Sequence, residues 1–188
     1  MFRSPGSFRL PTALGALVAV FLLLTASAAP ALAAADNPSG LPVPRFVSTR
    51  SDPINVRVGP GTKYDIAWVY VKAGLPVEII AEFDVWRKIR DVDGSEGWVH
   101  QNLLIGNRSG YVAPWSKGEQ IPLRTRAGED AGIRAYLTPG FKVDIASCDG
   151  QWCAVSATDH PASGRPSTYS GYLPQSEIWG VYRNEKFD

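Results

Sequence analysis

The stretch from Ile54 to Leu104 reads INVRVGPGTKYDIAWVYVKAGLPVEIIAEFDVWRKIRDVDGSEGWVHQNLL, and it decides the fold class. Short runs rich in β-branched and aromatic residues alternate in it with turn residues. Asp93-Gly94 lies between two such runs, which is a strong hairpin signal. We expect strands around residues 55–57, 66–71, 77–82, 86–90 and 98–99. Five short strands in about 50 residues predict a small β-barrel or half-open sandwich.

The same order of residues returns later in the chain. A second copy begins at Ile121 with IPLRTRAGEDAGIRAYLTPGFKVDIASCDGQWCAV and closes with SGYLPQSEIWG at Gly180. It differs by a polar insertion at about residues 157–169. The corresponding residues include Arg57 and Arg124, Gly61 and Gly128, Trp86 and Trp152, and Gly97-Trp98-Val99 and Gly171-Tyr172-Leu173.

This repeat predicts an all-β protein of two tandem domains, at residues 42–106 and 111–182. Each unit is near the lower size limit for a self-sufficient core, so we expect the two copies to pack together.

The N-terminal residues 1–35 are predicted to be a cleaved signal peptide. Arg3 and Arg9 precede an apolar core at residues 13–24, and small residues ending at Ala33 or Ala35 form the cleavage region. A membrane anchor is the alternative, but so short an apolar core does not comfortably cross a ~30 Å hydrocarbon layer. No cysteine stands directly after the cleavage region and no later apolar span follows, so we expect a periplasmic or secreted protein without a lipid anchor.

The charge balance argues against nucleic-acid and lipid partners. Cleavage would remove two arginines and no acidic residue, which changes the formal net charge from +1 to −1. Nucleic-acid binding requires a basic stripe, and binding to anionic lipid favours a polybasic run; the mature sequence has neither.

The two cysteines, Cys148 and Cys153, are predicted to form a disulfide, because a nearby pair oxidises outside the cytoplasm. They flank the hairpin residues 149–152 and should lie opposite one another. In the first copy their counterparts are Glu82 and Arg87, which predicts an exposed ion pair at the same place.

Residue types for catalysis are scarce. His100 and His160 are the only histidines, both thiols are assigned to the disulfide, and no G-x-S-x-G motif is present. We expect no enzyme activity, no cofactor and no metal site.

The first copy resembles the bacterial SH3 (SH3b) family, and the layout is similar to exported tandem SH3-like proteins of Gram-negative bacteria. The resemblance rests on residues 55–62 (NVRVGPGT), Tyr64, Gly74, Trp86 and Gly97-Trp98-Val99. It implies SH3-like barrels that bind peptidoglycan peptides or other envelope ligands. It also implies that the loop carrying Tyr64 borders the ligand groove, although this tyrosine could instead pack the loop onto the barrel.

The strand around residues 66–71 has two possible roles. Alternation puts Ala67, Val69 and Val71 on one face and Trp68 and Tyr70 on the other. If the small aliphatic residues face the core, the aromatic pair points outward, toward a ligand or the second repeat. Trp86 and Trp98 complete the candidate ligand-binding set of Tyr64, Trp68, Tyr70, Trp86 and Trp98. Together with Trp152, however, they suit core or hairpin packing better than recognition.

We therefore expect an envelope binding module that holds an extended peptide, such as a peptidoglycan stem, in an aromatic groove. The alternative is a periplasmic scaffolding protein that docks a protein partner and has no affinity for the wall.

Overall fold

The computed structural model describes residues 37–188, so the predicted signal peptide at residues 1–35 lies outside the described residues. This part of the chain is built of β-strands and two short 3-10 helices, with no α-helix. None of its helices is long and apolar enough to cross a membrane.

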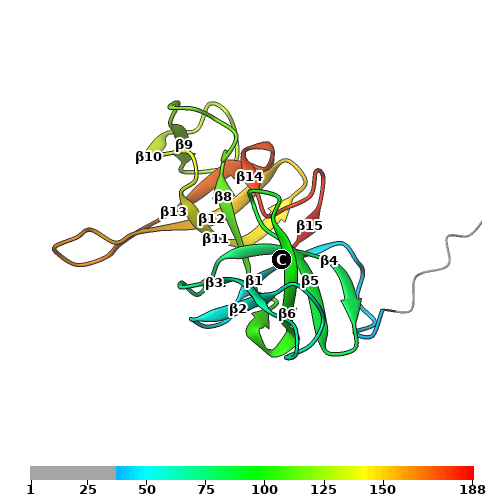
Figure 1. The fold of residues 1–188 in the computed structure, drawn as a ribbon. Coiled ribbons are helices and arrows are strands. Elements are labelled where there is room, and N and C mark those ends of the chain that lie inside the picture. The colour runs from blue at the N-terminus through cyan, green and yellow to red at the C-terminus, as the bar shows by residue number, and fades with distance from the viewer. Residues whose placement is uncertain (1–36) are drawn as a thin grey trace, which may run out of the picture. The chain divides into compact units, whose positions relative to one another are not determined.

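The strands form two sheets, one for each repeat (Figure 1). The first contains β1 (Arg45–Thr49), β2 (Ile54–Arg57), β3 (Ile66–Tyr70), β4 (Pro76–Phe83), β5 (Trp86–Arg90), β6 (Glu96–His100) and β7 (Leu104–Ile105), with the 3-10 helix η1 (Gln101–Leu103). The second contains β8 (Arg108–Val112), β9 (Ile121–Arg124), β10 (Ile133–Leu137), β11 (Lys142–Asp149), β12 (Trp152–Asp159), β13 (Ser167–Pro174), β14 (Ile178–Trp179) and β15 (Lys186–Phe187), with η2 (Gln175–Glu177).

The two sheets have the same topology. Their strand orders are β3-β2-β6-β5-β4-β1-β7 and β10-β9-β13-β12-β11-β8-β14, and β15 adds to β11 in the second. The prediction of an all-β chain with two tandem repeats is therefore confirmed. The five strands expected in the first copy are β2 to β6, whereas β1 and β7 were not predicted.

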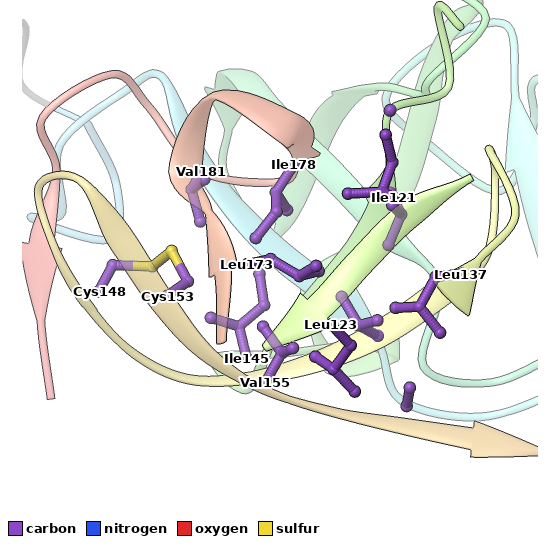
Figure 2. Packing of buried hydrophobic residues seen from close by; sticks show 14 residues of the cluster. Ile121, Leu123, Leu137, Ile145, Cys148, Cys153, Val155, Leu173, Ile178 and Val181 are labelled. Atoms are coloured by element: carbon purple, nitrogen blue, oxygen red, sulfur yellow. A yellow bond between two sulfur atoms is a disulfide. The ribbon is translucent and has the colours of Figure 1, made fainter. Parts of the chain in front are cut away.

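Each repeat has its own hydrophobic core. Eight buried residues form the first core: Val47, Ile54, Val56, Val77, Ile79, Ile89, Val99 and Leu104. Fourteen form the second, which includes both cysteines at one end (Figure 2). The first core is thus the smaller one and needs further apolar volume.

That volume comes from Trp68 and Tyr70, so the prediction that this pair points outward is wrong. Both rings pack against the first core, in edge-to-face contact at 6.1 Å. Val69 and Val71 are instead exposed, at 43% and 72%. Side chains alternate along this strand as predicted, but the aromatic residues face the core and the valines face solvent. The small first core accommodates the two large rings. In the second repeat the counterpart of Trp68 is Ala135.

The central hairpins confirm the predicted exchange of an ion pair for a disulfide. Glu82 lies opposite Arg87 in the β4–β5 pairing, with 3.2 Å between Arg87 Nε and Glu82 Oε1. Cys148 lies opposite Cys153 in the β11–β12 pairing, and the two are bonded. The ion pair is buried rather than exposed as expected, since the side chains of Glu82 and Arg87 are 0% and 5% accessible.

A network of hydrogen bonds supports the buried Glu82 carboxylate. The Ser39 amide and hydroxyl donate to it at 2.9 and 2.7 Å, and Arg45 Nη2 donates at 2.6 Å. Burial raises the pKa of Glu82, but the hydrogen bonds from Ser39 and Arg45 outweigh it and leave the pKa below its ordinary value. Arg87 Nη2 in turn donates to Gln101 Oε1 at 2.5 Å.

Contacts between the repeats centre on Phe46 of β1. Its ring packs edge-on against Trp179 at 5.1 Å and lies 4.9 Å from the ring of Tyr182. The Tyr182 hydroxyl donates to Glu78 Oε1 at 2.7 Å, and the hydroxyls of Ser48 and Ser109 are also 2.7 Å apart. The expected packing of one copy against the other is therefore present.

The polar insertion of the second copy extends the β12–β13 hairpin into a two-stranded arm (Figure 1). Hydroxyl pairs line one face of the arm, with Ser156 opposite Ser170 and Thr158 opposite Thr168, each pair at 3.0 Å. The short turn at Asp93-Gly94 occupies the corresponding place in the first repeat.

The Glu82 network predicts a specific acid sensitivity. Glu82→Gln removes the charge that compensates two arginines and should cost about 3 kcal/mol of unfolding free energy near neutral pH. Because folding lowers the pKa of Glu82, its contribution is present above pH 4.5, the ordinary value, and is lost as the pH falls through the lowered pKa. Urea unfolding from pH 7 to pH 3 should therefore show the difference from wild type shrinking with acid.

Glu96→Gln is the matched control for this measurement. Glu96 makes a single exposed ion pair with Lys88, so its removal should cost far less at any pH. Equal losses for the two variants, or a Glu82→Gln loss that does not depend on pH, would contradict the network.

Candidate functional site

The outer face of β5 and β6 carries the side chains that do not enter the first core. Inward positions on these strands are buried, among them Ile89 and Val99, which belong to the core. Because side chains alternate along a strand, the other positions point to the outer face. These are Trp86, Lys88 and Arg90 on β5 and Glu96, Trp98 and His100 on β6; Arg90 and Glu96 are exposed and the other four are half-buried.

Strand register brings these side chains together. Trp86 lies directly opposite His100, and their rings meet edge to face at 5.6 Å. Lys88 lies opposite Trp98 on one side, and Arg57 of β2 lies opposite Trp98 on the other. We call Trp86, Trp98, His100, Arg57 and Lys88 the aromatic face.

Tyr64 borders this face through Arg57. The guanidinium Nη1 of Arg57 donates to the Tyr64 carbonyl at 2.7 Å, which ties the Gly59–Tyr64 loop to β2. The tyrosine ring lies over Gly59, where an added Cβ would be 2.5 Å from Tyr64 Cδ1. Glycine at residue 59 therefore lets the ring pack on the backbone while 36% of the residue stays exposed.

The charges on the aromatic face have different partners. Lys88 Nζ lies 2.5 Å from Glu96 Oε2, and this hydrogen bond lowers the pKa of Glu96. Arg57 uses Nη1 for the Tyr64 carbonyl. Its guanidinium has further N–H groups, which are suited to a carboxylate on an extended peptide.

The structure thus brings together three of the five predicted ligand-binding residues. Tyr64, Trp86 and Trp98 belong to one surface, whereas Trp68 and Tyr70 pack inward on the core. Trp86 and Trp98 do not belong to the first core, but Trp86 pairs with Phe83 at the β4–β5 hairpin, as the alternative of hairpin packing expects. His100 and Arg57 were not predicted as site residues. Cross-strand register is the signal that places them, and it needs strand pairings that one sequence does not supply.

The second repeat keeps the arginine and the tryptophan of this site as Arg124 and Trp152, and has Tyr172 in place of Trp98. Arg124 Nη1 donates to the Ala131 carbonyl at 2.9 Å, as Arg57 does to Tyr64. The other positions differ between the repeats: Ala131 stands in place of Tyr64, Arg126 of Gly59, Ala154 of Lys88, Tyr172 of Trp98 and Pro174 of His100. The loop tyrosine, the lysine and the histidine of the aromatic face are therefore found only on the first repeat.

Comparison with protein families agrees with this architecture. A model of the bacterial SH3 domain matches residues 50–106 and again residues 117–180. The chain belongs to the bacterial SH3 domain family. Each of the two matches falls within one of the two sheets, so both copies are bacterial SH3 domains.

More distant comparisons add little. No curated protein matches the chain. Among solved structures, NlpC2 and NlpC1 from Trichomonas vaginalis are each 12% identical, with a TM-score of 0.29. These matches cover 72% and 74% of this chain but only 48% and 46% of the two solved chains, so this bacterial SH3 protein spans about half their length.

The inward packing of Trp68 predicts unequal costs of removing tryptophans. Trp68→Ala opens a cavity in a small core and should cost about 3 kcal/mol of unfolding free energy. Trp98→Ala removes a half-buried ring from the outer face and should cost about 1 kcal/mol, because less apolar area leaves water there. Urea unfolding followed by far-ultraviolet circular dichroism measures both, and the reverse order would show that the faces of the sheet are assigned wrongly.

Proposed function

We propose that this protein is an exported cell-envelope binding module without enzymatic activity, and that its first repeat holds an extended peptide on the aromatic face. A peptidoglycan stem peptide, which carries carboxylates, is the ligand class that fits best. Membership of the bacterial SH3 domain family supports the general role, as does the predicted signal peptide. The Cys148–Cys153 disulfide suits an oxidising compartment outside the cytoplasm.

The observation that carries the proposal is that Arg57 lies beside Trp98 in the strand register and also holds the loop of Tyr64. Arg57 pairs with Trp98 across the strands and holds the Tyr64 loop by a 2.7 Å hydrogen bond. Arg57 thus joins the Tyr64 loop to the strand that pairs with Trp98, and this surface offers apolar contact area and a charge-assisted hydrogen bond to the same ligand. The side chains of the aromatic face are half-buried, so part of their surface is already out of water before a ligand binds and we expect modest affinity.

A protein partner is the alternative, and the β12–β13 arm is the feature that favours it. Beyond Ser156, β12 pairs only with β13 among the described strands, so both edges of the arm are open. Open edges can add a strand from another chain. The Trp68–Tyr70 pair no longer supports this alternative, because both rings lie against the first core.

Co-sedimentation with protein-free peptidoglycan sacculi tests the proposed function. The purified wild-type protein should be retained, and Tyr64→Ala and Trp98→Ala should each reduce retention about tenfold through loss of aromatic contact area. Moderate salt should affect retention only slightly, because most of the contact is apolar.

Tyr136→Ala is the matched control, because Tyr136 is an exposed tyrosine on the second repeat. It should be retained like wild type. Absence of wild-type retention at low and moderate salt would exclude wall binding and favour the protein partner. Retention that neither Tyr64→Ala nor Trp98→Ala changes would place the wall contact elsewhere on the molecule.

A further inference from the structure

The first sheet ends in a strand whose outer edge is open. β3 is the terminal strand of the order β3-β2-β6-β5-β4-β1-β7, and among the described strands it pairs only with β2. Its free edge therefore presents backbone N–H and C=O groups to solvent. Residues 66–71 (IAWVYV) include no charged residue, no proline and no glycine. A segment of this composition on an open edge readily pairs with another strand.

Exposed apolar side chains gather at the same edge. Ile66, Val69 and Val71 lie outside the first core and are 47%, 43% and 72% exposed. Val58, which follows β2, is 62% exposed, and its amide donates to the Asp65 carbonyl at 3.1 Å, which holds it beside the start of β3. We call Val58, Ile66, Val69 and Val71 the edge patch. Exposed apolar side chains that cluster in this way indicate a contact surface, whereas single ones do not.

The second repeat protects the equivalent edge. The pairing of β10 with β9 has the register of β3 with β2, so Arg134 of β10 takes the position of Ala67. Both residues are exposed and both lie where the register shifts. A charged residue on an edge strand opposes the addition of a further strand. The chain thus carries a blocking residue on β10 and none on β3.

The residues that flank β3 are charged and opposite in sign. Asp65 precedes the strand and Lys72 follows Val71, and both are exposed. Neither side chain forms an ion pair with any of residues 37–188. When two β3 strands pair antiparallel, the start of each lies beside the end of the other, so Asp65 of one copy approaches Lys72 of the second copy at both ends. The segment is therefore complementary to a second copy of itself.

We propose that the protein forms a two-fold dimer in which β3 pairs antiparallel with β3 of a second copy, so that the two first sheets become one. Pairing satisfies the open backbone groups, removes part of the edge patch from water and forms the contact between Asp65 and Lys72 twice. An interface built on one short strand is smaller than the usual ~1,600 Å², so we expect a dissociation constant of about 10–100 µM. The dimer does not depend on the proposed peptide site, but with that site it makes the protein bivalent.

Sedimentation-velocity ultracentrifugation of the protein without residues 1–35, from about 5 to 500 µM, tests the proposal. The wild type should change from monomer to dimer with concentration and form nothing larger, because a two-fold interface is closed. Ala67→Arg introduces the residue that β10 carries at the equivalent position and should weaken association at least about tenfold. The second repeat accommodates an arginine there, so this variant should fold like the wild type, as circular dichroism can check.

Exchange of the flanking charges supplies a second measurement. Asp65→Lys and Lys72→Asp should each weaken association about five- to tenfold, because each places like charges together at both ends of the interface. The double variant restores opposite charges and should dimerise like the wild type. Gln120→Arg is the control for Ala67→Arg, because it adds the same charge at an exposed position of the second repeat and should leave association unchanged.

Several outcomes would overturn the inference. One is a wild-type protein that stays monomeric at the highest concentration, and another is a dimer that Ala67→Arg does not weaken. Species that grow beyond the dimer would show an open contact instead of a two-fold one. A double charge variant that associates no better than either single variant would contradict the antiparallel pairing of β3 with itself.

Discussion

In each repeat two buried side chains lie directly opposite one another at the central hairpin: Glu82 and Arg87 in the first, Cys148 and Cys153 in the second. The kind of bond between them determines which neighbouring segments must contact the hairpin. In the first repeat Glu82 and Arg87 form an ion pair. Two buried charges are stable only when other groups complete their hydrogen bonds. Ser39 and Arg45 therefore meet Glu82, and Gln101 accepts from Arg87, so the segment before β1 and the helix η1 are both held by this pair.

In the second repeat Cys148 and Cys153 form a disulfide, which needs no additional hydrogen-bonding groups. Arg108, the counterpart of Arg45, pairs instead with Glu185 in the segment before β15, and its guanidinium lies 4.5 Å from the ring centroid of Phe187. Gln101 Oε1 of η1 accepts a hydrogen bond from Arg87, whereas Gln175 Oε1 of η2 has no donor among the described residues. The exchange in the hairpin is thus accompanied by a different docked segment and by an unpaired buried acceptor in η2. The two repeats share a fold but present different side chains on their surfaces.

Most of the fold could be predicted from the sequence, because turn residues and β-branched runs recur in both copies in the same order. The pairing of Cys148 with Cys153, and of Glu82 with Arg87, followed from aligning the two hairpins. The orientation of Trp68 could not be predicted, since it depends on how much volume the first core lacks. Of the candidate site, the three outward aromatic residues were identified, but the cations and His100 beside them depend on cross-strand register, which alternation within one strand does not give.

The central claim is that the first repeat binds an envelope peptide on its aromatic face. Chemical-shift mapping of the full protein with a soluble peptidoglycan stem peptide tests it most directly, because it locates the contact without a mutation. We predict shifts at Tyr64, at the Trp86 and Trp98 indoles and at the Arg57 guanidinium, with Tyr172 and Trp152 of the second repeat unchanged. Shifts confined to the second repeat or to the β12–β13 arm, or no shifts at saturating peptide, would contradict the claim.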